Sequence, residues 1–267
     1  MSMVTFGEAL AVVRGAESGS FATQNELVLG TGGAEANVAI GVARLGGRAT
    51  WMGRVGADPL GYRILRELQA EGVEVRATID PDASTGLILK ERPRPGRSTV
   101  LYFRSGSAGS KLSLADLDDL PLAPGDTLHV TGISLALSPT AEALVYGAVA
   151  RAREIGAIVS FDVNHRASLW RGRDPRPAYM NVAGMSDLVF AGADEAALIA
   201  PDADSVPNQA RAISELGPGE VVVKLGPGGA YGMIHGVTFQ EPALATNVVD
   251  TVGAGDAFVA DFLGAGT

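Results

Sequence analysis

One segment of the chain limits the choice of fold and chemistry more than any other: Val249-Asp250-Thr251-Val252-Gly253-Ala254-Gly255-Asp256-Ala257-Phe258. It is a loop of small residues that opens an apolar helix, and such a loop presents N–H groups where anions are stabilised. Gly253 and Gly255 let phosphate oxygens approach the main chain. Asp256 lies in the first turn, where a carboxylate can accept the proton of an attacking hydroxyl. The alternative is a structural turn in which Asp256 only caps the helix.

This segment differs from two common nucleotide-binding fingerprints. In the G-x-G-x-x-G pattern the third glycine would fall at Phe258, and no strand, helix and acidic residue follow it. The chain contains no G-x-x-x-x-G-K-[ST] sequence either. A Rossmann oxidoreductase and a P-loop enzyme are therefore both disfavoured.

A second glycine cluster is Gly30-Thr31-Gly32-Gly33-Ala34-Glu35-Ala36-Asn37, which leads into a helix. Its small residues favour a close-packed floor for a small polar ligand, with the Asn37 amide binding hydroxyl groups. The alternative is a plain loop that carries Asn37 on the first helical turn.

Strand and helix patterns alternate along most of the chain. Apolar runs predict strands at 4–6, 50–55, 127–130, 157–163, 188–190 and 221–225, and helical spacing predicts helices at 36–45, 60–70 and 139–155. This alternation predicts a mainly parallel sheet covered by helices on both faces. The β-rich runs 85–91 and 98–104 interrupt it, and they predict a hairpin that forms a small projecting sheet with residues 10–14.

Composition excludes several classes of function. The 267 residues are 46% hydrophobic and 19% charged, with no interdomain linker, so we expect one domain over 1–267. A net charge of −9 argues against binding to nucleic acid or to an anionic membrane. The absence of Cys excludes disulfides and thiolate sites. The first residues do not read as a signal peptide, and no apolar run approaches the ~20 residues of a membrane span, so we expect a cytoplasmic protein.

The two glycine segments together carry a family resemblance. Gly32-Gly33-x-x-x-Asn37-x-Ala39 and Asp250-Thr251-x-Gly253-Ala254-Gly255-Asp256 resemble the N-terminal and C-terminal signatures of ribokinase-like (phosphofructokinase-B) sugar kinases, in the expected order. The resemblance implies a ribokinase-like α/β fold: an αβα sandwich with a mainly parallel central sheet and a small β-sheet lid. The lid would come from residues 9–32 and 84–107.

The resemblance also implies a role for each matching residue. Asp256 would be the catalytic base, and Gly253, Ala254 and Gly255 would form the anion hole for the phosphoryl group of ATP. Lys224, Gly226 and Gly229 would lie beside the nucleotide. Asn164 and Glu195 would handle phosphate and Mg²⁺ through water, without a direct protein ligand to the metal.

Two arginines point to the class of sugar. Arg104 follows the hairpin and Arg166 follows a buried strand, and arginine binds a carboxylate bidentately, which a neutral sugar does not require. The segments around them resemble 2-keto-3-deoxygluconate kinases, in which Gly33 and Tyr102 would contact the sugar and the arginines its acid end. A fructokinase, another ketose kinase and a non-catalytic binding protein of the same fold are the alternatives.

The resemblance further implies a homodimer formed through the lid. Leu87, Leu89 and Leu101 provide apolar positions for a buried lid face. The three histidines have no metal-ligand spacing, and we expect structural or surface roles for them: His129, His165 and His235.

The chain departs from the family pattern at four points. Gly192 stands where an Asn usually precedes Glu195, Asp261 stands at a small-residue position, and residues 87–89 lack a common aromatic. Relatives also continue for several helices beyond residue 267. We therefore expect exposed apolar surface near the C-terminal part of the sheet and weaker nucleotide binding.

Overall fold

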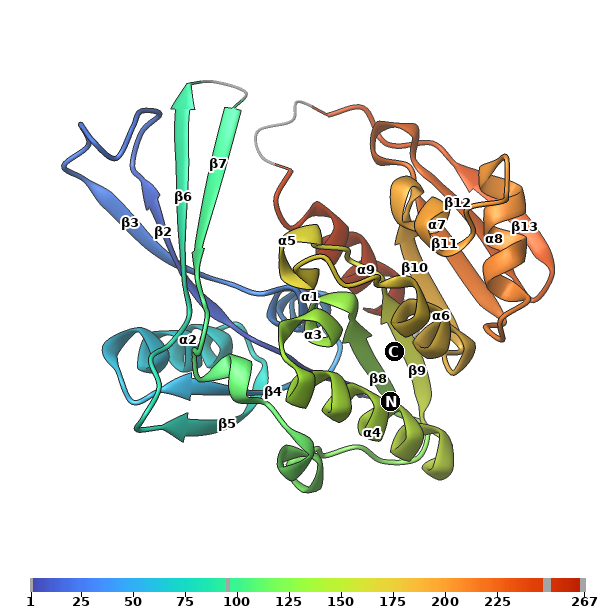
Figure 1. Ribbon diagram of the computed structural model, residues 1–267, viewed down its shortest axis with the longest axis horizontal. Helices are drawn as coiled ribbons and strands as arrows, with labels where there is room; N and C mark the ends of the chain where they lie inside the picture. Colours follow the sequence, from blue (N-terminus) through green and yellow to red (C-terminus); the bar gives the residue numbers. More distant parts are fainter. Residues whose placement is uncertain (1, 95–96, 247–250, 265–267) are drawn as a thin grey trace.

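Parallel strands form the centre of the molecule, as the alternating pattern predicts (Figure 1). The computed structural model describes residues 2–94, 97–246 and 251–264. Its large sheet has the order β13-β12-β11-β10-β9-β8-β1-β4-β5, which is parallel from β5 to β11 and antiparallel at β12 and β13. The strands are β1 Met3–Phe6, β4 Ala49–Gly56, β5 Glu74–Asp80, β8 Thr127–Thr131, β9 Ile158–Asp162, β10 Leu188–Gly192, β11 Glu220–Lys224, β12 Ala230–Ile234 and β13 Val237–Glu241.

Helices cover both faces of this sheet, because successive side chains of a strand point to opposite faces. On β10, Val189 and Ala191 join one core with α3, α4, α6, α7 and α8, whereas Leu188 and Phe190 join a second core with α1, α2 and α9. The helices are α1 Ala34–Arg44, α2 Pro59–Ala70, α3 Gly132–Leu137, α4 Pro139–Ile155, α5 Ala167–Trp170, α6 Arg176–Gly184, α7 Ala193–Ile199, α8 Val206–Ser214 and α9 Ala254–Gly264, with 3-10 turns at η1 Gly109–Lys111, η2 Leu114–Asp119 and η3 Gly226–Gly228.

Helix α9 is held by tight packing against α1 and β10. A Cβ on Gly41 of α1 would lie 2.4 Å from the Cβ of Ala260, so the two helices approach closely. On the sheet side, the Phe190 ring meets the rings of Phe258 and Phe262 edge-on, with centroids 6.4 Å and 5.3 Å apart. Asp261, the unusual charge on this helix, is exposed to solvent. The packing fixes the start of α9, where Asp256 lies.

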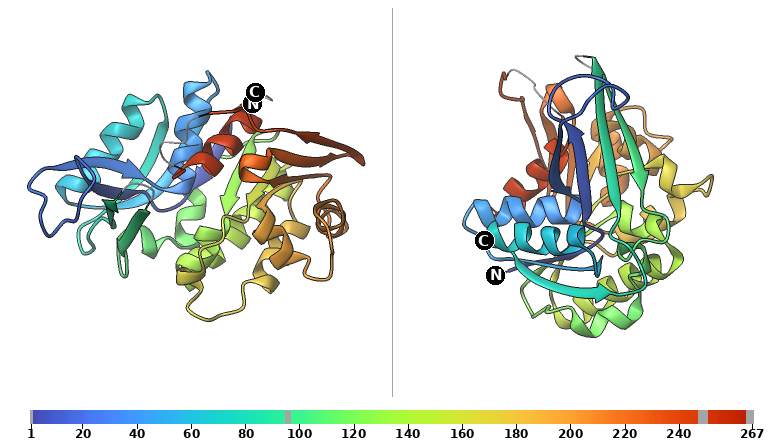
Figure 2. Two further views of the ribbon diagram at one scale, coloured as in Figure 1. Left: turned by 90° about the horizontal axis from the view of Figure 1, so that it is seen from above. Right: turned by 90° about the vertical axis from the view of Figure 1, so that its left-hand side faces the viewer.

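A separate four-stranded sheet extends away from the large one (Figures 1 and 2). Its order is β3-β2-β6-β7, and it contains the predicted hairpin as the antiparallel pair β6 and β7. The strands are β2 Leu10–Gly15, β3 Leu27–Gly32, β6 Leu87–Arg94 and β7 Arg97–Phe103. Pro95 and Gly96 of the predicted turn lie outside the described residues.

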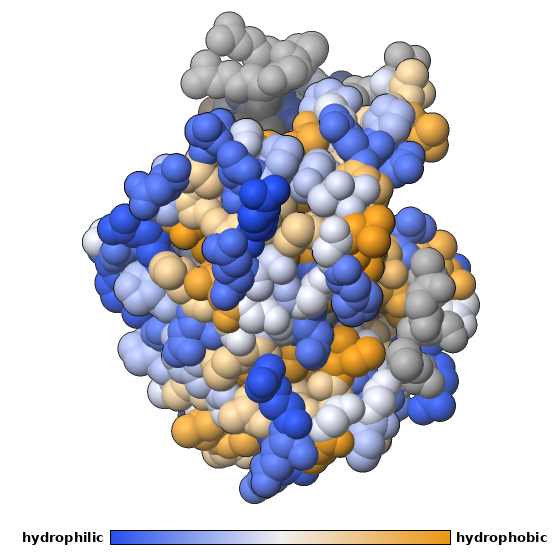
Figure 3. Space-filling model, turned by 90° about the vertical axis from the view of Figure 1, so that its right-hand side faces the viewer, coloured by the Kyte–Doolittle hydropathy of each residue, from blue (hydrophilic) through white to orange (hydrophobic). Residues whose placement is uncertain are grey.

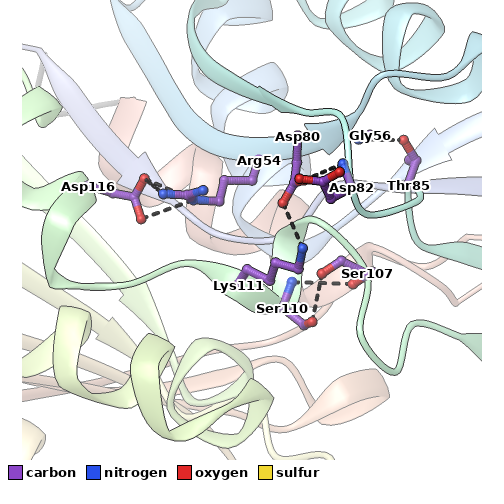
Figure 4. A network of polar contacts seen from close by, with 9 residues as sticks. All are labelled: Arg54, Gly56, Asp80, Asp82, Thr85, Ser107, Ser110, Lys111 and Asp116. Carbon is purple, nitrogen blue, oxygen red and sulfur yellow. Dashed lines mark hydrogen bonds and ion pairs between the residues drawn. The ribbon is translucent and has the colours of Figure 1, made fainter.

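Polar contacts tie the base of this hairpin to the large sheet (Figure 4). The Asp58 carboxylate accepts from Gly61 N–H at the start of α2 and from Thr85 N–H at the start of the hairpin, both at 2.8 Å. Thr85 Oγ1 in turn accepts from Gly56 N–H at 2.9 Å. Beyond the hairpin, Lys111 pairs with Asp80 at 3.0 Å. These contacts therefore anchor the hairpin of the small sheet to the large sheet.

Several strands were not predicted from the sequence. Strand β5 lies at one edge of the large sheet, and β12 and β13 form a hairpin at the other. The turn between β12 and β13 has positive φ at His235 (47°) and Gly236 (82°), which is typical of a two-residue hairpin turn. The His235-Gly236 pair is therefore the feature of the sequence that could have predicted this hairpin.

Exposed apolar side chains occur in the C-terminal part of the chain. They are Val237 on β13, Leu244 after that strand and Val252 before α9. On the face turned toward the viewer in Figure 3, apolar and hydrophilic residues are interspersed.

Of the described helices, none combines the length and the apolar character needed to cross a lipid bilayer.

Candidate active site

The carboxyl ends of the parallel strands bring most of the predicted site residues to one edge of the sheet. Asn164 follows β9, Glu195 follows β10, and Lys224 ends β11. Helices α1 and α9 begin at the same place and supply Asn37 and Asp256. Ligands bind at this edge in open α/β sheets.

Asp256 is held by two amides from distant parts of the chain. Asn37 Nδ2 donates to its Oδ2 at 2.7 Å, and Asn164 Nδ2 donates to its Oδ1 at 3.2 Å. The residue is only 8% exposed, and burial raises the pKa of its carboxyl, while the amides and the charge of Lys224 oppose the rise. A fixed carboxylate with a raised pKa is suited to accepting a proton.

The glycine-rich turn before α9 lies between Asn37 and Lys224. Gly253 has φ +81°, and a Cβ built there would be 3.9 Å from Asn37 Nδ2. A Cβ on Gly255 would be 3.6 Å from Lys224 Nζ. Ala254 begins the helix, and its N–H donates to the Thr251 carbonyl oxygen at 3.2 Å, while the N–H groups of Gly255 and Asp256 have no partner within the helix. Val249 and Asp250 of the signature lie outside the described residues.

Lys224 is paired with an aspartate that the sequence reasoning did not select. Lys224 Nζ donates to both carboxylate oxygens of Asp162, at 2.7 Å and 2.9 Å. Burial raises the pKa of Asp162 to about 6, and the nearby charges of Glu195 and Asp256 add to the rise, while Lys224 opposes it. The signal for Asp162 was its position as a charged residue inside a buried apolar strand.

Asn164 and Glu195 organise the turn after β9. Asn164 has φ +35°, rare for a residue other than glycine, and this turn directs its side chain to Asp256. Glu195 Oε1 accepts from His165 N–H at 2.7 Å, and Oε2 accepts from Gly192 N–H at 2.6 Å. Glu195 thus fixes the backbone at His165, after β9, and at Gly192, at the end of β10. Gly192 stands at the position where the family usually has an Asn side chain.

The oxygen donors near Asp256 fit a hydrated cation better than a directly bound one. Asp162 holds Lys224, and both oxygens of Glu195 already accept N–H groups. Mg²⁺ retains several of its waters in such sites, and these waters can donate to occupied carboxylates. Among the described residues, no group of three or more His, Asp or Glu side chains could enclose a metal ion.

The remaining predicted glycines serve different purposes. Gly33 has φ +144°, and a Cβ there would lie 2.6 Å from the carbonyl oxygen of Glu8, so only glycine fits at the start of α1. Gly226 is exposed, with φ +56° and open space around it. A Cβ on Gly229 would lie 1.9 Å from the carbonyl oxygen of Glu241, so this glycine permits the close approach of β13.

Arg104 is engaged by a buried glutamate that was also missed. Its Nε and its terminal nitrogen contact Oε2 of Glu8 at 2.6 Å and 2.5 Å, and Ser107 donates to the other oxygen of Glu8. Tyr102 is about half exposed, with the Arg104 guanidinium 5.7 Å from its ring centroid. Arg104 is thus largely neutralised before any ligand binds.

Arg166 differs from Arg104 because it has no carboxylate partner among the described residues. It is exposed, and its NH1 donates to the His165 carbonyl oxygen at 3.0 Å. Burial raises the pKa of Asp256, and the charge of Arg166 is one of the influences that oppose this rise. No contact joins the two arginines in the described part of the chain.

Glu35 is another buried carboxyl that the sequence reasoning did not assign. Its Oε1 accepts from Thr131 and Ser134, each at 2.7 Å, and burial raises its pKa. Its side chain fills the space beside Gly7, so Glu35 joins α1 to the ends of β1 and β8.

Comparison with known proteins places this geometry in a family. The chain is 39% identical over 264 residues to a 2-dehydro-3-deoxygluconokinase of Bacillus subtilis, covering 97% of this chain and 81% of the relative. It is 35% identical over 234 residues to a fructokinase of Klebsiella pneumoniae, covering 87% and 75%. The crystal structure of a PfkB protein from Polaromonas sp. JS666 superposes with a TM-score of 0.89 at 32% identity, covering 99% and 88%.

These similarities confirm the ribokinase-like fold and the family expected from the two glycine signatures. Residues 2–265 match the profile of the pfkB family carbohydrate kinases. With Asp256, its two amides and the glycine turn gathered at one edge of such a sheet, the chain belongs to the pfkB family of carbohydrate kinases and is a sugar kinase.

Proposed function

We propose that this protein transfers the γ-phosphoryl group of ATP to the terminal hydroxyl of 2-dehydro-3-deoxygluconate. The observation that carries the proposal is Asp256, buried and held by Asn37 and Asn164 next to the Gly253–Gly255 turn and the Lys224 ammonium. The similarity to the Bacillus subtilis 2-dehydro-3-deoxygluconokinase supports this sugar acid as the acceptor.

In this mechanism each group acts at a defined atom. Asp256 accepts the proton of the sugar hydroxyl while the hydroxyl oxygen forms a bond to the γ-phosphorus. The bond between the γ-phosphorus and the β,γ-bridging oxygen breaks, and ADP leaves with that oxygen. The N–H groups of the Gly253-Ala254-Gly255 turn and Lys224 Nζ stabilise the charge on the phosphoryl oxygens. Gly226 and Gly229 lie by the nucleotide. Asn164 and Glu195 would hold Mg²⁺ through water, and the ion would supply neutralisation of phosphate charge.

For the sugar, Gly33 and Asn37 form the floor of the site and Tyr102 contacts the substrate from the small sheet, which acts as a lid. Arg166 binds the acid end, assisted by Arg104. One observation favours a second candidate, a fructokinase: Glu8 neutralises Arg104, which leaves Arg166 as the one predicted arginine without a carboxylate partner in the described residues.

The two candidates are separated by an ADP-release assay on the purified chain with ATP, Mg²⁺ and either 2-dehydro-3-deoxygluconate or fructose. Turnover with the sugar acid at a kcat/KM well above that for fructose supports the proposal. The reverse preference establishes the fructokinase alternative. No turnover from a folded protein with either sugar would reject both candidates and would leave another ketose kinase or a non-catalytic binding protein of the same fold.

Replacing Arg166 by Ala is expected to raise KM for 2-dehydro-3-deoxygluconate about 10- to 100-fold, since a hydrogen bond to a charged group contributes about 1.5–3 kcal/mol. KM for fructose should stay unchanged. Arg153→Ala is the matched control, because Arg153 is also exposed and also donates from NH1 to a carbonyl oxygen at 3.0 Å. Equal losses for both sugars in Arg166→Ala would refute the carboxylate contact.

We also propose that the protein forms a homodimer through one face of the small sheet. The strand register places Leu29, Val13, Leu89 and Leu101 in one row across the four strands of that face, with the pair Leu87 and Phe103 beside it. Leu29, Leu101 and Phe103 remain exposed in the single chain. An apolar face of this kind marks an interaction surface, and the self-association of identical chains covers it symmetrically.

The change Leu101→Glu is expected to convert the dimer to a monomer in light scattering at micromolar concentration, because it places a charge in the apolar interface. Leu114→Glu is the control, since Leu114 on η2 is 52% exposed against 51% for Leu101 but lies outside the small sheet. A monomeric unmodified protein, or a Leu101→Glu variant that stays dimeric, would rule out this interface.

A further inference from the structure

Three aromatic side chains form a hydrogen-bonded chain that ends at His165, the residue that follows the Asp256 partner Asn164. Trp170 Nε1 lies 2.8 Å from the Tyr179 hydroxyl, and that hydroxyl lies 2.9 Å from His165 Nδ1. We propose that His165 presents Nε2–H as a hydrogen-bond donor to an anionic oxygen of a bound ligand, and that Tyr179 and Trp170 fix the tautomer that makes this donor available. The inference deepens the proposed sugar-acid kinase activity and rests on it.

The direction of each hydrogen bond follows from the chemistry of the groups. An indole N–H can only donate, so the Tyr179 oxygen is the acceptor of the Trp170 bond. Among the described residues, His165 Nδ1 is the one acceptor within hydrogen-bond distance of this buried hydroxyl, so the proton of the phenol points at it. Burial raises the pKa of the Tyr179 phenol above its ordinary value, so the hydroxyl keeps that proton. His165 Nδ1 is therefore an acceptor, and in the neutral ring the proton lies on Nε2.

The ring has little freedom to turn. Tyr179 is fully buried, and its ring meets the His165 ring at 90° and the Trp170 ring at 87°, with centroids 5.9 Å and 5.3 Å apart. The His165 backbone is fixed as well, because its N–H donates to Glu195. Since the two ring nitrogens lie on opposite sides of the imidazole, Nε2 points away from the buried phenol.

The surroundings of Nε2 identify the class of ligand. Within the described residues, no polar atom is paired with it, and the ring is only half-buried. The preceding residue, Asn164, contacts Asp256, and the following residue, Arg166, brings a positive charge that opposes the rise that burial causes in the pKa of Asp256. A hydrogen-bond donor on the residue between Asn164 and Arg166 suits an oxygen of a carboxylate or of a phosphoryl group.

The tautomer can be observed directly by ¹⁵N NMR of the imidazoles, since the chain has only three histidines. His165→Gln assigns the signal of His165, while His129 is fully buried and His235 is exposed. We expect a protonated Nε2 and an unprotonated Nδ1, and a shift of Nε2 when a ligand binds. A response to 2-dehydro-3-deoxygluconate alone assigns the carboxylate, and a response only to MgADP assigns a phosphoryl oxygen. A protonated Nδ1, or no response to either ligand, overturns the proposal.

Variants give a second, kinetic test. His165→Phe should raise KM for the ligand that shifts Nε2 about 10-fold or more, with kcat nearly unchanged, because the contact forms with the bound ground state. His165→Gln places an amide donor close to Nε2 and should recover part of the loss. Equal KM values for the Phe and Gln variants would contradict a donor role.

Tyr179→Phe removes the hydroxyl and keeps the ring, so it tests the positioning role alone. We expect mixed tautomers in the NMR spectrum and a rise in KM about threefold, smaller than for His165→Phe. Tyr146→Phe is the control, since Tyr146 is a partly buried tyrosine on α4. An unchanged His165 signal in Tyr179→Phe would refute this role. If the unmodified protein does not turn over sugar acids, the proposed function is wrong. The ¹⁵N NMR measurement tests the His165 tautomer separately, because it does not depend on turnover.

Discussion

Replacing Asp256 by Asn is expected to lower kcat about 10²- to 10⁴-fold, the range for loss of a general base, because an amide cannot accept the hydroxyl proton. Sugar binding should be largely retained, since the amide side chain has nearly the same size as the carboxylate it replaces. The measurements are kcat in the ADP-release assay and the sugar Kd by calorimetry.

We expect Asp256→Asn to affect stability in the opposite direction from activity. Burial raises the pKa of Asp256, so the folded state disfavours its charged form, and stability is lost as pH rises through the titration of this group. Removing the charge should leave Tm at neutral pH unchanged or higher. Loss of activity with an intact Tm would thus separate catalysis from folding.

Asp261→Asn provides the matched control, because Asp261 lies on the same helix and is exposed. This change should affect neither kcat nor Tm. Near-normal turnover in Asp256→Asn would reject the assignment of Asp256 as the base.

Replacing Lys224 by Met is expected to affect both activity and stability. The ammonium beside Gly255 would no longer offset phosphoryl charge, and kcat/KM should fall about 10²- to 10³-fold, as for loss of one stabilising donor. Asp162 would be left buried without its cation, which destabilises a protein by about 3–5 kcal/mol. Denaturant unfolding and the ADP-release assay measure the two effects.

The double variant Asp162→Asn with Lys224→Met separates these effects. It removes the orphaned charge, so most of the stability should return, while kcat/KM should stay low because the ammonium is still absent. Recovery of activity together with stability would show that Lys224 acts only by pairing with Asp162.

The free energy of unfolding of Lys224→Met is expected to fall as pH rises. Burial raises the pKa of Asp162 to about 6 with Lys224 present, and removal of the ammonium raises it further. The folded variant then holds the Asp162 proton more tightly than the unfolded chain does, so its stability falls as pH rises. The deficit relative to the unmodified protein should be largest above neutral pH and should shrink on acidification.

Lys111→Met is the control for both variants. Lys111 pairs with Asp80 at 3.0 Å, but its side chain is far more exposed than that of Lys224, so the change should cost at most about 1 kcal/mol. Activity should be unaffected.

Much of the architecture could be predicted from local sequence signals. The spacing of apolar residues predicted helix α4 at its observed bounds, and the β-rich runs around residues 92–97 predicted the hairpin of the small sheet. Strands β5 and β13 lie at the edges of the sheet, where half-exposed strands carry a weaker apolar pattern, and neither they nor β12, which pairs with β13, were predicted.

The sequence by itself determined the family and the position of Asp256, because glycines that need positive φ and apolar residues at fixed spacing are local properties of the chain. Only the tertiary structure decided the partners of the charged residues. Asn37 meets Asp256 across 219 residues, Lys224 meets Asp162, and Arg104 meets Glu8. These pairs depend on which strand ends adjoin in the sheet and on how deeply each charge is buried. Strand order and burial arise from the packing of the whole chain, so no local pattern encodes them.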